Sequence, residues 1–166
     1  RARFGTLSLA QTTITGNTVD GLGTGVYGVF LDDAKNIHLG VTGAGNTVTG
    51  SKIGIYARAG LGSTTVVDNL VEGNGSGVVL SAARHLAMTA DNRIVDNPAY
   101  GILAQGAFVD TTMSGVTVSG STVGLCLSGA TNLVVAGGNV FTGNSAHALY
   151  AVGDDEVRRA REAEAD

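Results

Sequence analysis

The sequence predicts an all-β protein that folds as a right-handed parallel β-helix, a solenoid of about six coils. Three observations predict this class: a short apolar phrase that returns about every 24 residues, abundant glycine, and almost no proline. The chain has 166 residues, with 26 glycines, one proline and 43% hydrophobic residues. Glycine at this level without the three-residue period of collagen, together with short β-branched runs, is typical of many short strands joined by tight turns.

The repeated phrase consists of one small residue followed by three mostly apolar residues. It occurs six times, and its leading positions are separated by 26, 23, 24, 23 and 24 residues. A unit that returns at a fixed step of roughly 20 to 50 residues is typical of repeat proteins, in which each unit packs on the next. The phrase begins at Gly28, Gly54, Gly77, Gly101, Gly124 and Ala148.

Each repeat contains two further short strands. One of them is marked by a phrase Asn-x-Val/Ile, or Asn-x-Phe in the last copy, which lies before the small-residue phrase. The other, a third strand, is visible at Ile37–Leu39, Leu86–Met88 and Leu133–Val135. One coil cannot bury its own apolar side chains, whereas stacked coils close a core and pair each strand with neighbours about 4.8 Å away. The asparagine phrases lie at 17–19, 46–48, 69–71, 92–94 and 139–141, and the fifth copy, Val116-Thr117-Val118, lacks the asparagine.

Equivalent positions of stacked coils form columns, so each column is interpreted as one feature. Two apolar columns are predicted to face the core: Val29, Ile55, Val78, Ile102, Leu125 and Leu149, and Val19, Val48, Val71, Ile94, Val118 and Phe141. Stacked amides at a corner can hydrogen-bond along the rod and to the turn backbone, which predicts a structural ladder. Its members are Asn17, Asn46, Asn69, Asn92 and Asn139, and a second polar column, Ser51, Asn74, Asn97, Ser121 and Asn144, is expected to act in the same way.

The phrases GNTVTG…GIYA (45–57) and DNLVEGNGSGVVL (68–80) resemble the parallel β-helix repeat of the pectate-lyase-like superfamily. Coils of mannuronan C5-epimerases, of periplasmic β-helix proteins linked to copper-enzyme maturation, and of bacterial surface proteins are similar. The resemblance covers roughly residues 11–152 and implies the fold. It implies no single activity, because such repeats serve lyases, hydrolases, epimerases, phage spikes and adhesins.

The catalytic signatures of these enzymes have no match in the chain. In the epimerases, one coil carries Asp-Pro-His-Asp after the leading glycine, whereas the first phrase here continues Phe-Leu-Asp-Asp and the second Tyr-Ala-Arg-Ala. The clustered aspartates and basic residue that similar lyases use around calcium are also missing from the sequence. No family chemistry is therefore transferred to a residue, and whether the chain is an enzyme stays open.

Alternation along the strand places the column after the inward one on the outside of the rod. This predicted stripe is apolar and aromatic along its length, and an exposed strip of this kind usually marks an interface. Three interpretations stay open: another segment or subunit covers it, its rings stack on sugars, or the register is shifted and the strip is core. The stripe comprises Phe30, Tyr56, Val79, Leu103, Cys126 and Tyr150.

A polar rim follows the stripe two residues later in each coil. Asp32 and Arg58 lie one coil apart and are expected to be close enough to pair. A carboxylate beside a guanidinium suits acid–base chemistry on a uronate, and an exposed ion pair of little energetic weight is the alternative. The rim comprises Asp32, Arg58, Ser81, Gln105 and Ser128.

No metal site or cofactor is predicted. The histidines His38, His85 and His147 occupy different columns, and Cys126 is the only thiol, whereas zinc and copper need several converging donors. His85 occupies a turn position that is asparagine in other coils, which predicts hydrogen bonding along the rod. Asp68, Asp91, Asp96 and Asp110 fall in turns, where aspartate bonds the local backbone.

Charge and hydrophobicity exclude several classes of partner. The net charge is −4 and the repeats contain no basic cluster, so nucleic acid is not an expected partner. No stretch is long and apolar enough to span a bilayer as a helix. One cysteine permits no intrachain disulfide.

The composition changes sharply near the C-terminus. Residues 1–153 are predicted to form the β-helix, and residues 154–166 a charged helix or frayed tail rich in Ala, Arg and Glu. The chain opens without methionine or a signal-like segment, which predicts a mature or excised piece of a longer protein.

The sequence therefore favours a non-catalytic module, extracellular or at the cell surface with the periplasm as a further option. Its lateral stripe is expected to bind a polysaccharide or another protein chain, and a homo-oligomer is a further alternative. The second hypothesis is a segment of a polysaccharide lyase or C5-epimerase whose catalytic residues lie elsewhere. Release of unsaturated uronic acid from alginate or pectin by this segment would favour the enzyme.

Overall fold

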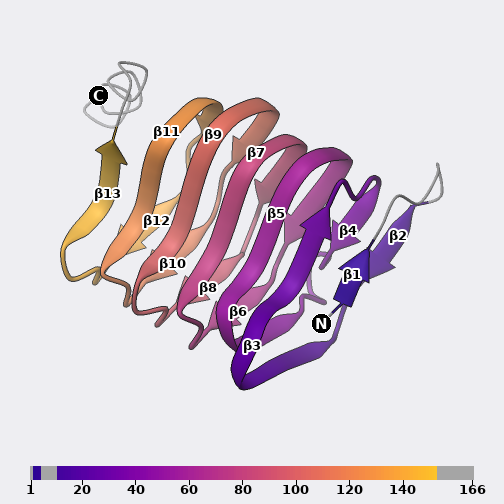
Figure 1. The fold of residues 1–166 in the computed structure, drawn as a ribbon, viewed down its shortest axis with the longest axis horizontal. Coiled ribbons are helices and arrows are strands. Elements are labelled where there is room, and N and C mark those ends of the chain that lie inside the picture. The colour runs from indigo at the N-terminus through magenta and orange to yellow at the C-terminus, as the bar shows by residue number, and fades with distance from the viewer. Residues whose placement is uncertain (1, 5–10, 153–166) are drawn as a thin grey trace.

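The computed structural model describes residues 2–4 and 11–152 and confirms an all-β parallel solenoid of about six turns (Figure 1). Within these residues every named element is a strand, and none is a helix that is long and apolar enough to cross a membrane. The predicted tail, 154–166, lies outside the described residues, as does residue 153 at the end of the predicted β-helix.

Thirteen strands form one continuous sheet that winds around the rod. Figure 1 shows β3, β5, β7, β9, β11 and β13 side by side, with the short strands β6, β8, β10 and β12 on another side of the coil. The strands are β1 (Ala2–Phe4), β2 (Thr12–Ile14), β3 (Thr18–Asp32), β4 (Ile37–Leu39), β5 (Thr47–Val67), β6 (Leu70–Glu72), β7 (Ser76–Thr89), β8 (Arg93–Val95), β9 (Tyr100–Met113), β10 (Thr117–Ser119), β11 (Val123–Val135), β12 (Val140–Thr142) and β13 (His147–Val152).

Each coil has three faces, which correspond to the three predicted strands. The first face contains the Asn-x-Val phrase, the second contains the small-residue phrase, and the third contains the strand typified by Ile37–Leu39. The structure departs from the prediction at the corner between the second and third faces. There β7, β9 and β11 run through the corner as single bent strands, because no more than three consecutive residues leave the ladder.

The two predicted inward columns form the core, which confirms their orientation. Val48, Ile55, Val71, Ile94 and Ile102 are almost completely buried, as are their column-mates in the middle coils. Val19, Phe141 and Leu149 are only partly buried because they belong to the first and last coils, where no further coil of the described residues covers them. Interior positions of this kind carry most of the stability of a stacked repeat.

The bend after the rim column has a residue with positive φ in each of the first five coils, where the structure describes it. The residue is Asp33, Ala59 or Ala82 in three successive coils and Gly106 or Gly129 in the next two. An L-residue in this left-handed region costs roughly 1–2 kcal/mol, whereas glycine adopts it freely. The alanines are therefore strained positions that the fold imposes.

Ala59→Gly should accordingly stabilise the protein, by about 0.5–1 kcal/mol after the greater unfolded-state entropy of glycine is subtracted. Chemical denaturation followed by circular dichroism measures the change. Ala87→Gly is the matched control, since Ala87 lies within a strand at an ordinary φ. That substitution should lower the free energy of unfolding by about 0.5–1 kcal/mol. If both variants changed the free energy of unfolding in the same direction, the explanation by backbone strain at Ala59 would be wrong.

The asparagine column forms a hydrogen-bonded ladder at the corner before the first face. Asn69 is 1% exposed, and its Oδ1 accepts hydrogen bonds from the backbone N–H and the side-chain amide of Asn46. Its own amide donates to the carbonyls of Leu39 and Val67 and to Asn92 Oδ1. The ladder thus supplies partners for backbone groups that the turn removes from the sheet.

The second polar column forms a similar ladder with two gaps. Asn97 Oδ1 accepts hydrogen bonds from the backbone and side-chain N–H groups of Asn74, and the Asn97 amide donates to the carbonyls of Val71 and Val95. Ser51 and Ser121 occupy the same column, and their buried hydroxyls have no hydrogen-bond partner. Serine is too short to reach the groups that asparagine bonds here.

Candidate binding face

All four tyrosines of the chain lie on the outer side of the second face. Two columns form this surface, which we call the tyrosine face. The first column consists of the residue directly before the small residue of each phrase. The second column consists of the residue two positions after the small residue. The first contains Tyr27, Ile53, Ser76, Tyr100, Val123 and His147, and the second is the predicted stripe, Phe30, Tyr56, Val79, Leu103, Cys126 and Tyr150.

The small residues explain why two columns point outward around one corner. A Cβ atom added to Gly28 would lie 2.4 Å from Val48 Cγ1, so this position faces the core. Gly101 is oriented in the same way, against Val118 Cγ1 at 2.1 Å. Because the glycine position and the following apolar residue both face inward, simple alternation fails, and the residue before the glycine faces outward.

Sequence reasoning missed Tyr27 and Tyr100 for this reason. Strict alternation through the glycine would have turned them toward the core. The sequence did contain a signal for this orientation, which is the small residue repeated between two larger residues in each phrase. A repeated glycine indicates a position where another part of the backbone approaches too closely for a side chain.

The exposure of the predicted stripe differs from the expectation of one continuous exposed strip. The register pairs its members coil by coil as expected, but Phe30, Val79 and Cys126 are only 6%, 4% and 4% exposed. Tyr56 and Leu103 are half-buried, and Tyr150 is 42% exposed. Phe30 is covered by the rings of Tyr27 and Tyr56 and by Arg58 of the rim. The face is therefore a half-buried apolar surface with a few exposed rings.

An aromatic cluster lies at the N-terminal end of the tyrosine face. The rings of Tyr27 and Phe30 stack with centroids 5.0 Å apart, and Tyr56 lies 5.2 Å and 5.5 Å from these two rings. At the other end of the face, His147 stacks on Tyr150 at 5.0 Å. Such contacts fix the orientation of large side chains, and pairs of this kind contribute about 0.5–1.5 kcal/mol beyond burial.

The polar rim begins with an ion pair beside this cluster. Nε and Nη2 of Arg58 donate to the two carboxylate oxygens of Asp32, each at 2.8 Å, and Arg58 Cζ lies 5.4 Å from the centre of the Phe30 ring. The hydrogen bonds to Asp32 and its negative charge raise the pKa of Arg58 above its ordinary value. The expected pairing of Asp32 with Arg58 is thus observed, and both carboxylate oxygens are engaged. Ser81, Gln105 and Ser128 continue the rim without charge.

A polar groove of about 660 Å³ lies on the third face. His38 Nδ1 is hydrogen-bonded with Thr65 Oγ1 at 2.7 Å, and His85 Nδ1 lies 3.2 Å from Asp110 Oδ2. His38 and His85 line the same groove, which the separate columns did not reveal. Thr65 pairs with both His38 and Ala87 across the sheet, so the two histidines belong to coils two apart, roughly 9.6 Å along the rod.

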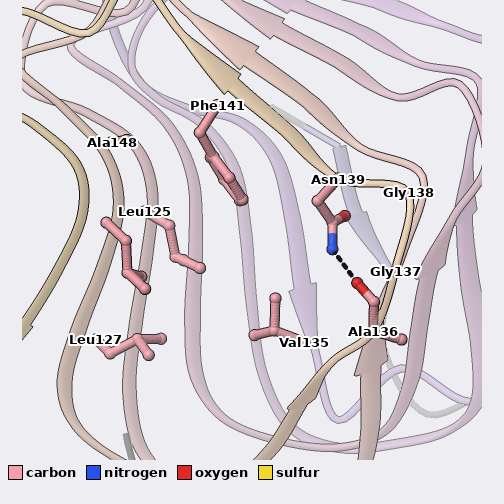
Figure 2. Close-up of a pocket in the computed structure, with 10 residues that line it drawn as sticks. Leu125, Leu127, Val135, Ala136, Gly137, Gly138, Asn139, Phe141 and Ala148 are labelled. Carbon is pink, nitrogen blue, oxygen red and sulfur yellow. Dashed lines mark hydrogen bonds between the residues drawn. The ribbon is translucent and has the colours of Figure 1, made fainter. Parts of the chain in front are cut away.

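An apolar cavity of about 440 Å³ opens at the C-terminal end of the core (Figure 2). Leu125, Leu127, Val135 and Phe141 line it, and Asn139 supplies one polar side chain, whose amide donates to the carbonyl of Ala136 at 2.5 Å. Small-molecule sites usually combine an apolar lining with several converging polar groups. This cavity is instead the end of the core at the last described coil.

The metal-binding side chains are dispersed over the rod. Met88 and Met113 are buried in the core, and Cys126 is buried on the tyrosine face, where burial raises the pKa of its thiol. Among residues 2–4 and 11–152, no three His, Cys, Asp or Glu side chains lie close enough together to hold a metal ion.

Comparison with known proteins gives one family. The model of a family described as "Periplasmic copper-binding protein (NosD)" matches residues 6–158. No curated protein matches the chain, and no solved structure matches it.

Proposed function

Because the chain belongs to the NosD family of periplasmic copper-binding proteins, we propose that it is a non-catalytic β-helix module that docks a partner protein on its tyrosine face. The periplasmic location of the family agrees with the location expected from the sequence, which included the periplasm. The parallel solenoid presents its outward side chains at a regular spacing, since each strand pairs with those of the neighbouring coils.

The observation that carries the proposal is the collection of all four tyrosines on one face. Tyrosine and arginine are enriched at protein interfaces, where charged residues are confined to the rim. The tyrosine face follows this pattern, because the twelve named positions of its two columns contain no Asp, Glu, Lys or Arg, while Arg58 and Asp32 border the face and Arg3 of β1 pairs with Phe30 at its end. Phe30 beneath the surface stacks on Tyr27 and Tyr56 and holds these rings in place, which lowers the entropy lost on binding.

The size of the face predicts a transient complex. Six coils at about 4.8 Å and roughly six residues per strand at about 3.3 Å each give a surface of roughly 570 Å². A standard protein interface uses about 800 Å² of each partner, and smaller ones belong to transient encounters. We therefore expect exchange of the partner rather than a permanent assembly.

The described residues do not fit a copper centre. Copper in proteins is held by imidazole, thiolate and thioether ligands, and the three histidines, one cysteine and two methionines of the sequence are all described. Met88 and Met113 are enclosed in the core, and His38 and His85 lie two coils apart. We accordingly assign no copper-dependent step to this chain.

A glycan partner is the second candidate, favoured by the spacing of the tyrosines. Tyr56, Tyr100 and Tyr150 belong to the second, fourth and sixth coils, so they recur roughly every 9.6 Å along the rod. Regularly spaced rings suit an extended sugar chain that stacks alternate units along the axis. The half-buried state of most of the rings favours the protein partner.

The test uses a photo-crosslinking residue at position 103, in the centre of the tyrosine face, with position 117 on the first face as the control. We expect a protein adduct from position 103 alone in periplasm. Binding of the purified adduct partner, measured by calorimetry, should weaken at least about tenfold in Tyr56→Ala/Tyr100→Ala, as for central aromatic interface residues. Thr117→Ala should leave it unchanged.

Two results would contradict the proposal. Equal crosslinking from positions 103 and 117 would mean that the tyrosine face is not a preferred surface. Loss of binding to soluble alginate or pectin in the double tyrosine variant, without a protein adduct, would identify the glycan candidate instead.

A further inference from the structure

The two ladders obey one directional rule. In each, a backbone N–H of one coil donates to the asparagine Oδ1 of the next coil toward the C-terminus, at about 3.0–3.1 Å. The rule holds between the second and third coils and between the third and fourth coils in both ladders. It holds again between the fifth and sixth coils, where Val116 donates to Asn139 and Ser121 to Asn144.

Both ladders are interrupted between the fourth and fifth coils. Val116 occupies the asparagine position of the first ladder, and Ser121, whose buried hydroxyl has no partner, occupies that of the second. The N–H groups of Asn92 and Asn97 should donate there, yet neither has a hydrogen-bond partner among the described residues. Asn92 and Asn97 are 2% and 0% exposed, so water does not readily replace the lost acceptors.

The interruption is specific to this seam among the described coils. Between the first and second coils, the hydroxyl of Ser51 is also unpartnered, but the first ladder is intact through Asn17 and Asn46. Unsatisfied buried N–H groups are costly, and local opening begins where such costs accumulate. Two of them at one level remove from the contact between residues 93–113 and residues 116–135 the ladder hydrogen bonds that the neighbouring levels keep.

We propose that the fifth and sixth coils, residues 116–152, form a separate opening unit that detaches at this seam while the first four coils stay folded. The seam crosses the tyrosine face between Leu103 and Cys126, so opening separates Tyr150 from the other tyrosines. It also frees the buried thiol of Cys126, the one cysteine of the chain. Local opening of the rod is thus expected between the fourth and fifth coils.

Labelling of Cys126 by a maleimide reagent at low urea measures the opening. Val116→Asn/Ser121→Asn restores both ladder positions and should slow labelling by about tenfold, the factor expected for two recovered hydrogen bonds. Position 121 lies beside a glycine as an asparagine position does, because a Cβ on Gly101 would lie 3.3 Å from Ser121 Oγ, much as one on Gly77 would lie 3.0 Å from Asn97 Nδ2. Ser51→Asn, the same replacement at a distant seam, should leave the rate unchanged.

Hydrogen exchange of the natural chain provides a second measurement that needs no variant. Protection should fall in one step, by about tenfold or more, between residues 70–72 and residues 117–119. A smooth decline toward the C-terminus would indicate ordinary fraying of the end and overturn the proposal. Equal labelling of Cys126 in the natural and repaired chains would overturn it as well.

Discussion

Gly77→Ala is expected to destabilise the protein by at least about 3 kcal/mol, the upper range for overpacking a core. A Cβ at this position would lie 2.4 Å from Ile94 Cγ2, 2.6 Å from the carbonyl oxygen of Gly101 and 3.0 Å from Asn97 Nδ2. One of these atoms is backbone of the next coil, so a side-chain rotation cannot relieve the clash. Thermal unfolding measured by calorimetry should show a loss of about 6–12 °C in Tm.

Gly137→Ala is the matched control for this prediction. Gly137 is exposed, has no atom within 4 Å of its added Cβ, and does not have a positive φ. Its replacement should change the free energy of unfolding by less than about 0.5 kcal/mol. If Gly77→Ala and Gly137→Ala had similar Tm values, the explanation of the repeated small residue would be wrong.

Asn69→Ala is expected to lower the free energy of unfolding by about 2–4 kcal/mol, because several buried polar groups lose their hydrogen-bond partners together. The backbone N–H and side-chain amide of Asn46 lose their acceptor, and the carbonyl of Leu39 loses a donor. All of these groups lie between stacked coils, where no other polar side chain replaces the amide. Urea denaturation followed by circular dichroism gives the change in the free energy of unfolding.

The control for this second prediction is Asn17→Ala at the end of the same ladder. Asn17 is exposed, and its amide donates to Asn46 Oδ1 and to the carbonyl of Thr15. Water can satisfy the groups left behind, so the cost should stay below about 1 kcal/mol. Equal costs at positions 17 and 69 would mean that burial of the ladder does not determine its contribution.

The fold was predictable because the same pattern of residues recurs in every coil of a solenoid. Val48, Val71 and Ile94 recur at the step of one coil, and each occurrence limits the register of the others. An error of one residue would turn every member of a column outward, so the shared pattern excludes it. The third strand was predicted at three of its six described occurrences. The three that were missed, 12–14, 64–67 and 111–113, begin with threonine where the predicted ones begin with isoleucine or leucine.

The candidate site was predictable only in part. The pairing of Asp32 with Arg58 followed from the step of one coil, and the structure shows it. The surface they border required knowledge of the corner, because the inward orientation of Gly28 and Gly101 brings Tyr27 and Tyr100 outward beside the stripe. The burial of Phe30 follows from neighbouring side chains such as Tyr27, and the repeated phrase that contains Phe30 does not predict it.

The sequence by itself determined the period, the inward columns and the polar corner columns of this protein, because each depends on contacts between equivalent residues one coil apart. The tertiary structure alone decided which outward side chains are exposed and which polar groups lack a partner. Exposure depends on neighbours from adjacent columns, and these are brought together by the angle of each corner, a three-dimensional quantity that no single column encodes.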